Sequence, residues 1–134
     1  MLSEVKRTGC KMIRLGVESS LLEVLDSIRK GLTLAQIEEG VRRVNKSGIQ
    51  ALGGFMLGFS YDFRKSIEQA IAFAKKLSPD QVQFSINMCY PGTSLYEYAR
   101  DYDLFLANSF QGFGMTHGPV VRLFISANFT EFTY

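Results

Sequence analysis

The chain has 134 residues, about the size of one domain and enough to bury a hydrophobic core. Its 46% hydrophobic and 21% charged residues are typical of a globular protein and exclude a disordered or fibrous one. The 15 basic and 13 acidic residues give a net charge of +2, too small to favour non-specific nucleic-acid binding.

The few cysteines and the single histidine limit the possible chemistry. Cys10 and Cys89 lie far apart in the sequence and form no CxxC pair, which favours two independent reduced thiols over a zinc or dithiol site. His117 alone excludes a two-histidine site, and a catalytic pair with Cys89 is disfavoured because His117 lies in a segment without a clear pattern. No secretory leader or membrane-spanning run is recognisable, so we expect a cytoplasmic location without membrane or nucleic-acid partners.

The first part of the chain predicts a helix, a strand and a second helix. Residues 3–8 are typical of the last turns of a helix closed by Gly9. Residues 11–18 alternate between an apolar and a mixed face, as a strand does. Residues 21–30 have helical spacing and end at Gly31 after two basic residues. The apolar face expected for that helix consists of Leu21, Leu22, Leu25 and Ile28.

The middle of the chain continues with a helix, a strand and a helix. Thr33 and Gln36 form a capping box that opens an amphipathic helix running to Gly48. Residues 50–59 are apolar and glycine-rich, which indicates a buried parallel strand. Asp62 is expected to head a helix that stops before Pro79, and its expected apolar face consists of Phe63, Ile67, Ala70, Ile71, Ala74 and Leu77.

The last recognisable elements are a strand and a short helix. Residues 81–90 alternate almost perfectly, and one side of this predicted strand is wholly polar. Ser94 and Glu97 form a second capping box that opens a helix over 94–102. From residue 104 onward the only recognisable element is one expected strand, at 120–126.

This order of elements predicts an α/β fold with parallel strands. A closed eight-stranded barrel takes about 250 residues, which this length excludes, and the polar strand faces argue against a doubly wound sheet. We therefore expect a partial (β/α) barrel, an incomplete TIM-like barrel with about three parallel strands and helices on the outer face, over residues 1–103. A poorly defined C-terminal tail is expected over 104–134.

Ligands of such folds bind at the carboxyl ends of the strands. Glu18 ends the first strand and could accept hydrogen bonds from ribose hydroxyls or an amine, or could merely pair with Arg14. The second strand ends in glycines that would let a flat ligand approach the backbone, although close helix packing explains them equally well. The candidate binding residues of the three strand ends are Glu18, Gly54, Met56, Gly58, Phe59, Asn87, Cys89 and Tyr90.

Several segments together resemble the second half of the radical S-adenosylmethionine core. The pattern is most similar to proteins with a cobalamin-binding domain and to methylthiotransferases. The segments that carry the resemblance, in the order and spacing of that family, are EVKRTGC (4–10), RLGVES (14–19), IRKG (28–31), GFMLGF (54–59) and YPGTSLY (90–96).

The resemblance implies a partial (β/α)₆ barrel in which this chain supplies roughly the fourth to sixth strands. It implies that Glu18 contacts the ribose or methionyl part of S-adenosylmethionine. It further implies that residues 54–59 and 87–90 enclose the adenine. In the intact family a [4Fe-4S] cluster supplies the electron that cleaves the cofactor and starts hydrogen abstraction from a substrate.

Two features depart from the family pattern. The CxxxCxxC loop that holds the cluster is not in this sequence, and Cys10 and Cys89 cannot replace it. Residues 59–62 read FSYD where relatives carry a proline-glycine-acid turn, although Asp62 keeps the acidic position. We therefore expect a fragment or split part of a radical S-adenosylmethionine enzyme that retains a half-site for the cofactor and is inactive alone.

Such an open sheet predicts a partner, which is either the missing amino-terminal half of the barrel or a second copy joined through an open strand edge. An alternative function is a non-catalytic α/β module that binds a partner protein through a strand edge and the aromatic residues 124–134. A non-functional truncated reading frame is a third interpretation. The sequence leaves the substrate and the involvement of cobalamin open.

Overall fold

The computed structural model describes residues 1–59 and 62–103. The chain forms two compact units. The first consists of Met1–Leu57 and Lys65–Ser85, and the second of Gly58–Arg64 and the chain from Ile86 onward. The expected strand at 120–126, the aromatic residues 124–134 and His117 lie outside the described residues.

The sheet is an open arrangement of three parallel strands in the order β1-β2-β3. The predicted α/β fold is confirmed, and this sheet with its flanking helices is consistent with a partial barrel. β1 and β2 pair in register from Met12 opposite Gln50 to Gly16 opposite Gly54. The strands are β1 (Met12–Glu18), β2 (Gln50–Leu57) and β3 (Gln81–Ile86), and the helices are α1 (Leu2–Arg7), α2 (Leu22–Ser27), α3 (Leu34–Ser47), α4 (Arg64–Leu77) and α5 (Ser94–Asp101).

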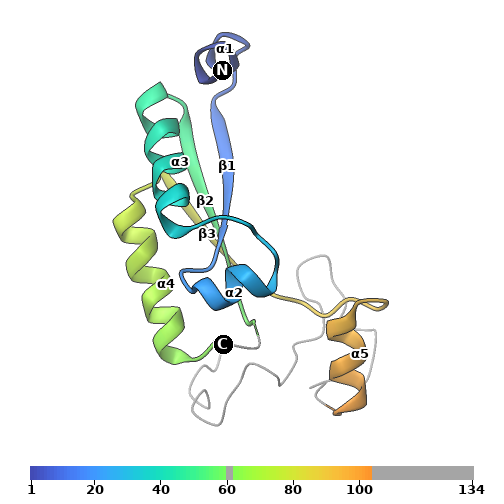
Figure 1. Ribbon diagram of the computed structural model, residues 1–134. Helices are drawn as coiled ribbons and strands as arrows, with labels where there is room; N and C mark the ends of the chain where they lie inside the picture. Colours follow the sequence, from blue (N-terminus) through green and yellow to red (C-terminus); the bar gives the residue numbers. More distant parts are fainter. Residues whose placement is uncertain (60–61, 104–134) are drawn as a thin grey trace. The chain divides into compact units, whose positions relative to one another are not determined.

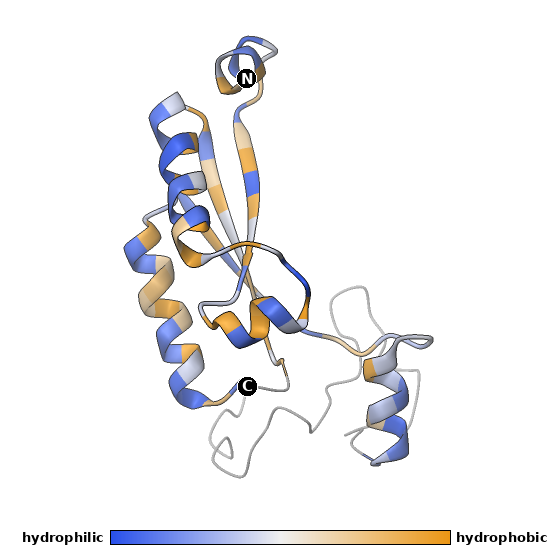
Figure 2. Cartoon of the chain, in the orientation of Figure 1, coloured by the Kyte–Doolittle hydropathy of each residue, from blue (hydrophilic) through white to orange (hydrophobic). Residues whose placement is uncertain are grey.

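The hydrophobic core lies between one face of the sheet and the helices α3 and α4, which cover the same side (Figure 1). Alternate residues of a strand point to opposite faces, so the odd-numbered residues of β1 and β2 supply the sheet side of this core. Figure 2 shows the apolar and polar residues alternating along β1. Core members include Val17, Ala51 and Phe55 from the strands, Ile37, Val41 and Val44 from α3, and Ala70, Phe73, Ala74 and Leu77 from α4.

Helix α3 forms as the sequence predicts. The Thr33 hydroxyl accepts a hydrogen bond from the Gln36 backbone N–H at 3.3 Å, and the Gln36 side chain accepts from the Thr33 N–H at 2.8 Å. Gly48 closes the helix in the left-handed conformation with φ +71°, where a residue without a side chain is least strained. The Lys6 ammonium donates to the Ser47 carbonyl at 3.0 Å and so ties α1 to the same end.

The predicted apolar face of α2 is correct for Leu25 and wrong for Leu22 and Ile28. This helix ends at Ser27 and buries Val24 and Leu25, whereas Leu22 and Ile28 are exposed. A helix of six residues has fewer than two turns, so its direction of entry rather than its periodicity decides which side chains meet the core.

The predicted start and face of α4 are also corrected. The helix begins at Arg64, because Asp62 bonds instead to the backbone of the preceding loop. Ser66 and Phe73 are buried, while Phe63 and Ile71 are about half exposed. The end at Leu77, before Pro79, is confirmed.

β3 is shorter than predicted and ends at Ile86 instead of Tyr90. In the second unit, α5 is capped by Thr93, whose hydroxyl accepts from the Tyr96 N–H at 3.3 Å, and not by Ser94. The two adjacent hydroxyl residues make the cap ambiguous in the sequence. No helix within the described residues is long and apolar enough to cross a membrane.

Candidate functional site

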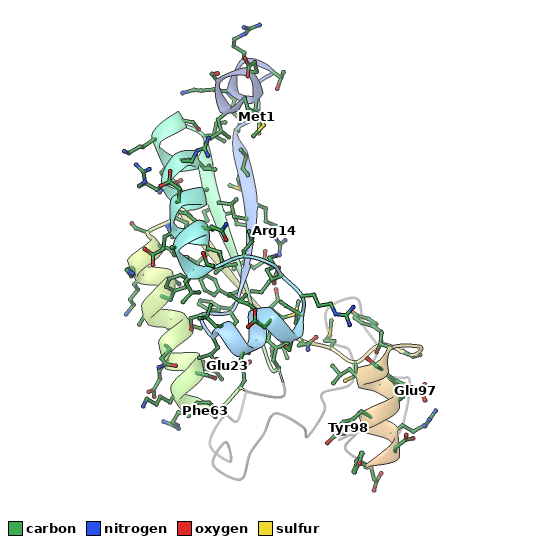
Figure 3. The ribbon with its side chains drawn as sticks, in the orientation of Figure 1. Met1, Arg14, Glu23, Phe63, Glu97 and Tyr98 are labelled. Carbon is green, nitrogen blue, oxygen red and sulfur yellow. The ribbon has the colours of Figure 1, made fainter. Side chains whose placement is uncertain are left out.

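The first unit has a second sheet face, opposite to α3 and α4, which we call the helix-free face. Because the odd-numbered residues of β1 and β2 meet the core, the even-numbered residues up to the end of the pairing point to this face. They are Met12, Arg14 and Gly16 on β1, and Leu52, Gly54 and Met56 on β2. Figure 3 shows Arg14 extending from β1 on the side away from α3 and α4.

The carboxyl end of β1 is irregular at Glu18. The pairing with β2 shifts between Gly16 and Glu18, so that Glu18 lies opposite Phe55. Glu18 itself has φ +65°, and the Ser19 N–H donates to the Val17 carbonyl across it at 2.9 Å. A three-residue turn around a non-glycine residue with positive φ is rare and strained. This irregularity redirects the Glu18 side chain, as bulges do next to functional sites.

The Glu18 carboxylate pairs with Lys30. The Lys30 ammonium donates to Glu18 Oε1 at 3.0 Å, and each side chain keeps 25% of its surface exposed. The expected alternative, in which Arg14 is the partner of Glu18, is wrong. The Arg14 side chain lies over Gly54 of β2. The bulge before Glu18 instead places its carboxylate beside Lys30, in the loop after α2.

Lys30 is held in place by the end of α2. The Arg29 N–H donates to the Asp26 carbonyl at 2.9 Å and the Lys30 N–H donates to the Leu25 carbonyl at 2.8 Å, which together form a Schellman motif. Arg29 takes the left-handed position with φ +53°, a role that sequence reasoning gave to Gly31. Both ends of the ion pair thus involve positive φ in a non-glycine residue: Glu18 is one member, and Arg29 directly precedes the other.

The ion pair lies over Gly16. A side-chain carbon at Gly16 would come within 2.9 Å of the Lys30 ammonium and would overlap Glu18 Oε1. Gly54, directly opposite on β2, is covered by Arg14, whose Nε would lie 3.4 Å from an added carbon. Two facing glycines, Gly16 and Gly54, thus lie beneath the charged side chains, whereas Gly53 lies on the core face, where an added carbon would come within 3.3 Å of Pro79.

Two serines follow Glu18. Ser19 is buried, and its hydroxyl accepts from the Leu21 N–H at 3.1 Å, which orders the entry into α2. The Ser20 hydroxyl oxygen is buried and has no hydrogen-bond partner in the described part of the chain. Buried hydroxyls are usually satisfied, so this oxygen beside Glu18 indicates that a further group belongs at the strand end.

The loop after β2 is closed by Asp62. Its Oδ2 accepts from the Gly58 N–H at 2.7 Å and from the Phe59 N–H at 3.0 Å. Gly58 has φ +90°, which suits a residue without a side chain. The departure from the family's proline-glycine-acid turn therefore keeps an acidic residue that organises the loop.

The remaining predicted site residues belong to the second unit. Asn87, Cys89 and Tyr90 follow β3, whereas Glu18, Gly54 and Met56 belong to the first unit. Gly58 and Phe59 are also in the second unit. Cys89 is buried with its Sγ 3.9 Å from the Leu95 carbonyl oxygen, and this burial raises the pKa of the thiol. A thiol held protonated in this way is a poor nucleophile.

Sequence reasoning missed Lys30, Ser20 and the loop-closing role of Asp62. Lys30 was recognised only as a helix-ending cation, since neither spacing nor periodicity shows that a residue 12 positions away reaches Glu18. In residues 1–59 and 62–103, no three side chains of His, Cys, Asp or Glu gather into a metal site.

Comparison with known proteins relates the chain to methyltransferases. It is 40% identical over 119 residues to an uncharacterized methyltransferase of Pyrococcus horikoshii, covering 89% of this chain and 26% of that protein. It is 31% identical over 96 residues to the bacteriochlorophyllide d C-12(1)-methyltransferase of Chlorobaculum tepidum, covering 71% of this chain and 21% of that protein.

A third relative is the anaerobic magnesium-protoporphyrin IX monomethyl ester cyclase of Cereibacter sphaeroides. The identity is 26% over 101 residues, covering 75% of this chain and 16% of that protein. The chain thus spans about a quarter or less of the length of these curated relatives. No protein-family model matches it.

Proposed function

We propose that this chain is the carboxy-terminal part of a radical S-adenosylmethionine enzyme core and carries one side of the S-adenosylmethionine site. The observation that carries the proposal is the Glu18 carboxylate, held at the carboxyl end of β1 over Gly16, the residue that faces Gly54 of β2. Ligands of parallel α/β folds bind at this end of the strands. Two of the four non-glycine residues with positive φ in the described part of the chain, Glu18 and Arg29, lie here and support a functional role, because each costs about 1–3 kcal/mol and such strain gathers at functional sites.

The comparisons support the choice of cofactor. Two of the relatives are methyltransferases, which need an activated methyl donor, and S-adenosylmethionine is such a donor. The matched part is about a quarter or less of each relative, which supports assigning this chain a portion of a core. The activity and substrate of the whole enzyme would then reside in a longer assembly.

The residues at the end of β1 fit a nucleoside. Glu18 can accept hydrogen bonds from two ribose hydroxyls or from an amine, and Ser20 offers a buried oxygen that still needs a partner. Met56, on the same face of β2 as Gly54, offers an apolar surface to a flat ring. S-adenosylmethionine, when bound, supplies a sulfonium-activated carbon.

The hydrogen bond from Lys30 orients the Glu18 carboxylate before a ligand arrives. A hydroxyl or amine donor can bind the carboxylate oxygen that Lys30 leaves free. Because both side chains are partly exposed, the pair can loosen at modest cost when the ligand binds. Glu18 therefore positions the ligand, and Lys30 positions Glu18.

The residues of this chain do not fit a [4Fe-4S] cluster. Three thiolates are needed, and the sequence has two cysteines, one in each unit. We propose that the chain is inactive alone and that a partner with the missing amino-terminal half of the barrel, joined at the open edge of β1, completes the enzyme. A second copy of the chain is the other partner proposed for an open edge.

The test is an amide NMR titration of the 134-residue chain with S-adenosylmethionine. We expect the amides of Glu18, Ser20 and Gly54 to shift together and to saturate, and E18Q to weaken the apparent affinity about tenfold by removing a charged acceptor. E23Q, a carboxylate lost from an exposed position of α2, is the matched control and should change nothing (Figure 3). Unmoved strand-end amides in a well-dispersed spectrum would contradict the proposal.

A second candidate function is partner binding through β3. Its apolar residues Val82 and Phe84 are 40% and 41% exposed, and they border a 390 Å³ groove beside α4. The groove is lined by Ile71, Ala74, Lys75, Ser78, Pro79, Val82 and Phe84. Sedimentation of the chain and of F84K tests this function. A concentration-dependent dimer that F84K abolishes would support it, and a monomer at all concentrations would exclude self-association there.

A further inference from the structure

Arg14 is an exposed cation on the helix-free face of the sheet. Neither a hydrogen bond nor an ion pair joins it to any other residue in the described part of the chain, although Glu18 lies on a neighbouring pleat of the same strand. Most of the other charged side chains at this end of β1 are accounted for, because Glu18 and Lys30 neutralise each other. Within residues 1–59 and 62–103, no acidic side chain forms an ion pair with Arg14 on the helix-free face.

The place of the guanidinium is defined by Gly54. An added side-chain carbon there would lie 3.4 Å from Arg14 Nε and 3.6 Å from Nη2, so the guanidinium rests over this glycine. Gly54 is buried even though it points to the face opposite the helices. The guanidinium thus lies over Gly54, next to Gly16 of the proposed nucleoside site.

Apolar residues on the same face as Arg14 favour strong hydrogen bonds between its guanidinium and a ligand. Met12, Leu52 and Met56 are its apolar neighbours on the same face. A charge-assisted hydrogen bond is stronger beside apolar groups than in bulk water, and a guanidinium presents two parallel N–H groups that match a carboxylate or a phosphate. The nearby Glu18 is prevented from filling this position because the bulge directs it to Lys30.

We propose that Arg14 binds an oxyanion, a carboxylate or a phosphate, of the substrate that lies next to the cofactor, and so selects acidic substrates. This proposal rests on the proposed function for the identity of the neighbouring ligand, but not for the binding of the oxyanion itself. Arg14 is then a specificity-determining residue, and Glu18 remains the residue that positions the cofactor.

The experiment follows the side-chain Nε–H signal of Arg14 in the 134-residue chain. Succinate and inorganic phosphate are the two oxyanion probes, and succinamide is the neutral analogue of succinate. We expect the Arg14 signal to shift and saturate with at least one oxyanion, with an apparent affinity about fivefold or more above that for succinamide. The probe with the stronger response identifies the group as a carboxylate or a phosphate.

Substitutions of Arg14 distinguish a specific oxyanion site from a charge that is only solvated. R14Q should abolish the response, and R14K should weaken it because an ammonium cannot form two parallel bonds. R7Q removes an exposed arginine of α1 and is the matched control, which should leave the response intact. An Arg14 signal that responds no more than that of Arg7, or equally to succinamide, would overturn the proposal.

The same samples distinguish this proposal from the proposed function. If R14Q loses the oxyanion response while Glu18 still shifts with S-adenosylmethionine, both proposals hold. If the oxyanion binds at Arg14 and S-adenosylmethionine moves nothing, the oxyanion site stands and the cofactor assignment fails. If only S-adenosylmethionine binds, the oxyanion site fails.

Discussion

β2 and β3 are neighbours in one sheet, yet their side chains meet different surroundings. Of the eight residues of β2, Ala51, Gly53, Gly54 and Phe55 are buried, whereas five of the six residues of β3 are exposed. β2 lies between two strands and beneath α3, whereas among the described residues β3 has a strand on one side only. Phe84 of β3 is as apolar as Phe55 of β2 but far more exposed. The neighbouring strands and helices, more than the apolar content of a strand, therefore decide how far its side chains are buried.

The largest expected loss of stability comes from truncating Phe55, the buried aromatic residue of β2. Phe55 is 1% exposed and its ring lies 5.2 Å from that of Phe84, which is 41% exposed. We expect F55A to lower the free energy of unfolding by about 3–5 kcal/mol. F84A, the matched control, should cost about 0.5–2 kcal/mol because less surface returns to water. Urea denaturation measures both, and an equal loss would show that β3 is covered in solution.

The next effect concerns the polar link between the two strands. The Asp80 carboxylate, just before β3, accepts a hydrogen bond from the Ala51 N–H of β2 at 2.7 Å. D80A leaves this buried donor unpaired, and we expect a loss of about 1–3 kcal/mol in the free energy of unfolding. D26A removes an exposed carboxylate of α2 and should change stability by less than about 0.5 kcal/mol. Similar midpoints for the two variants in a urea titration would refute a structural role for the link.

A smaller effect compares two helix caps. Thr33 forms a complete capping box with Gln36, whereas Thr93 caps α5 without a reciprocal side-chain bond. T33A should therefore cost about 1 kcal/mol and T93A less. Thermal unfolding followed by circular dichroism checks this order. T33S, which keeps the acceptor oxygen, should restore most of the loss.

The smallest effect concerns pH and Cys89. Burial raises the pKa of this thiol, so the folded state favours the protonated form. The stability gained by burying the neutral thiol is complete below the ordinary thiol pKa and is lost as the pH rises through the raised value. We expect iodoacetamide to label Cys89 at least about tenfold more slowly than the partly exposed Cys10 near pH 8, with mass spectrometry as the readout. Equal rates would mean that Cys89 is accessible.

Local signals in the sequence predicted the long elements well. The capping box at Thr33, the apolar spacing that follows and Gly48 each act within a few residues, so they determine α3 without help from the rest of the fold. The alternation of β1 and the glycine-rich apolar run of β2 likewise predicted these strands and their order. α2 was less well predicted, because a helix of six residues carries too little periodicity.

The site was predictable in part. The position of Glu18 at a strand end and the glycines of β2 follow from the pattern of residues, and the structure places Glu18 at the carboxyl end of β1 and Gly54 opposite Gly16. The partner of the carboxylate did not follow, since Arg14 is nearer in sequence and on the same predicted face as Glu18. Lys30 reaches Glu18 only because the bulge in β1 and the left-handed Arg29 bring the two side chains together.

By itself the sequence determined the class of fold, because the period of the apolar residues and the caps are local properties of the chain. Only the tertiary structure decided which residues share the end of β1. The two facing glycines exist as a floor only once β1 and β2 pair, and the charges above them are ordered by that pairing and by the turn after α2. Side chains distant in sequence meet through backbone geometry, and that geometry is set by the packing of the whole unit.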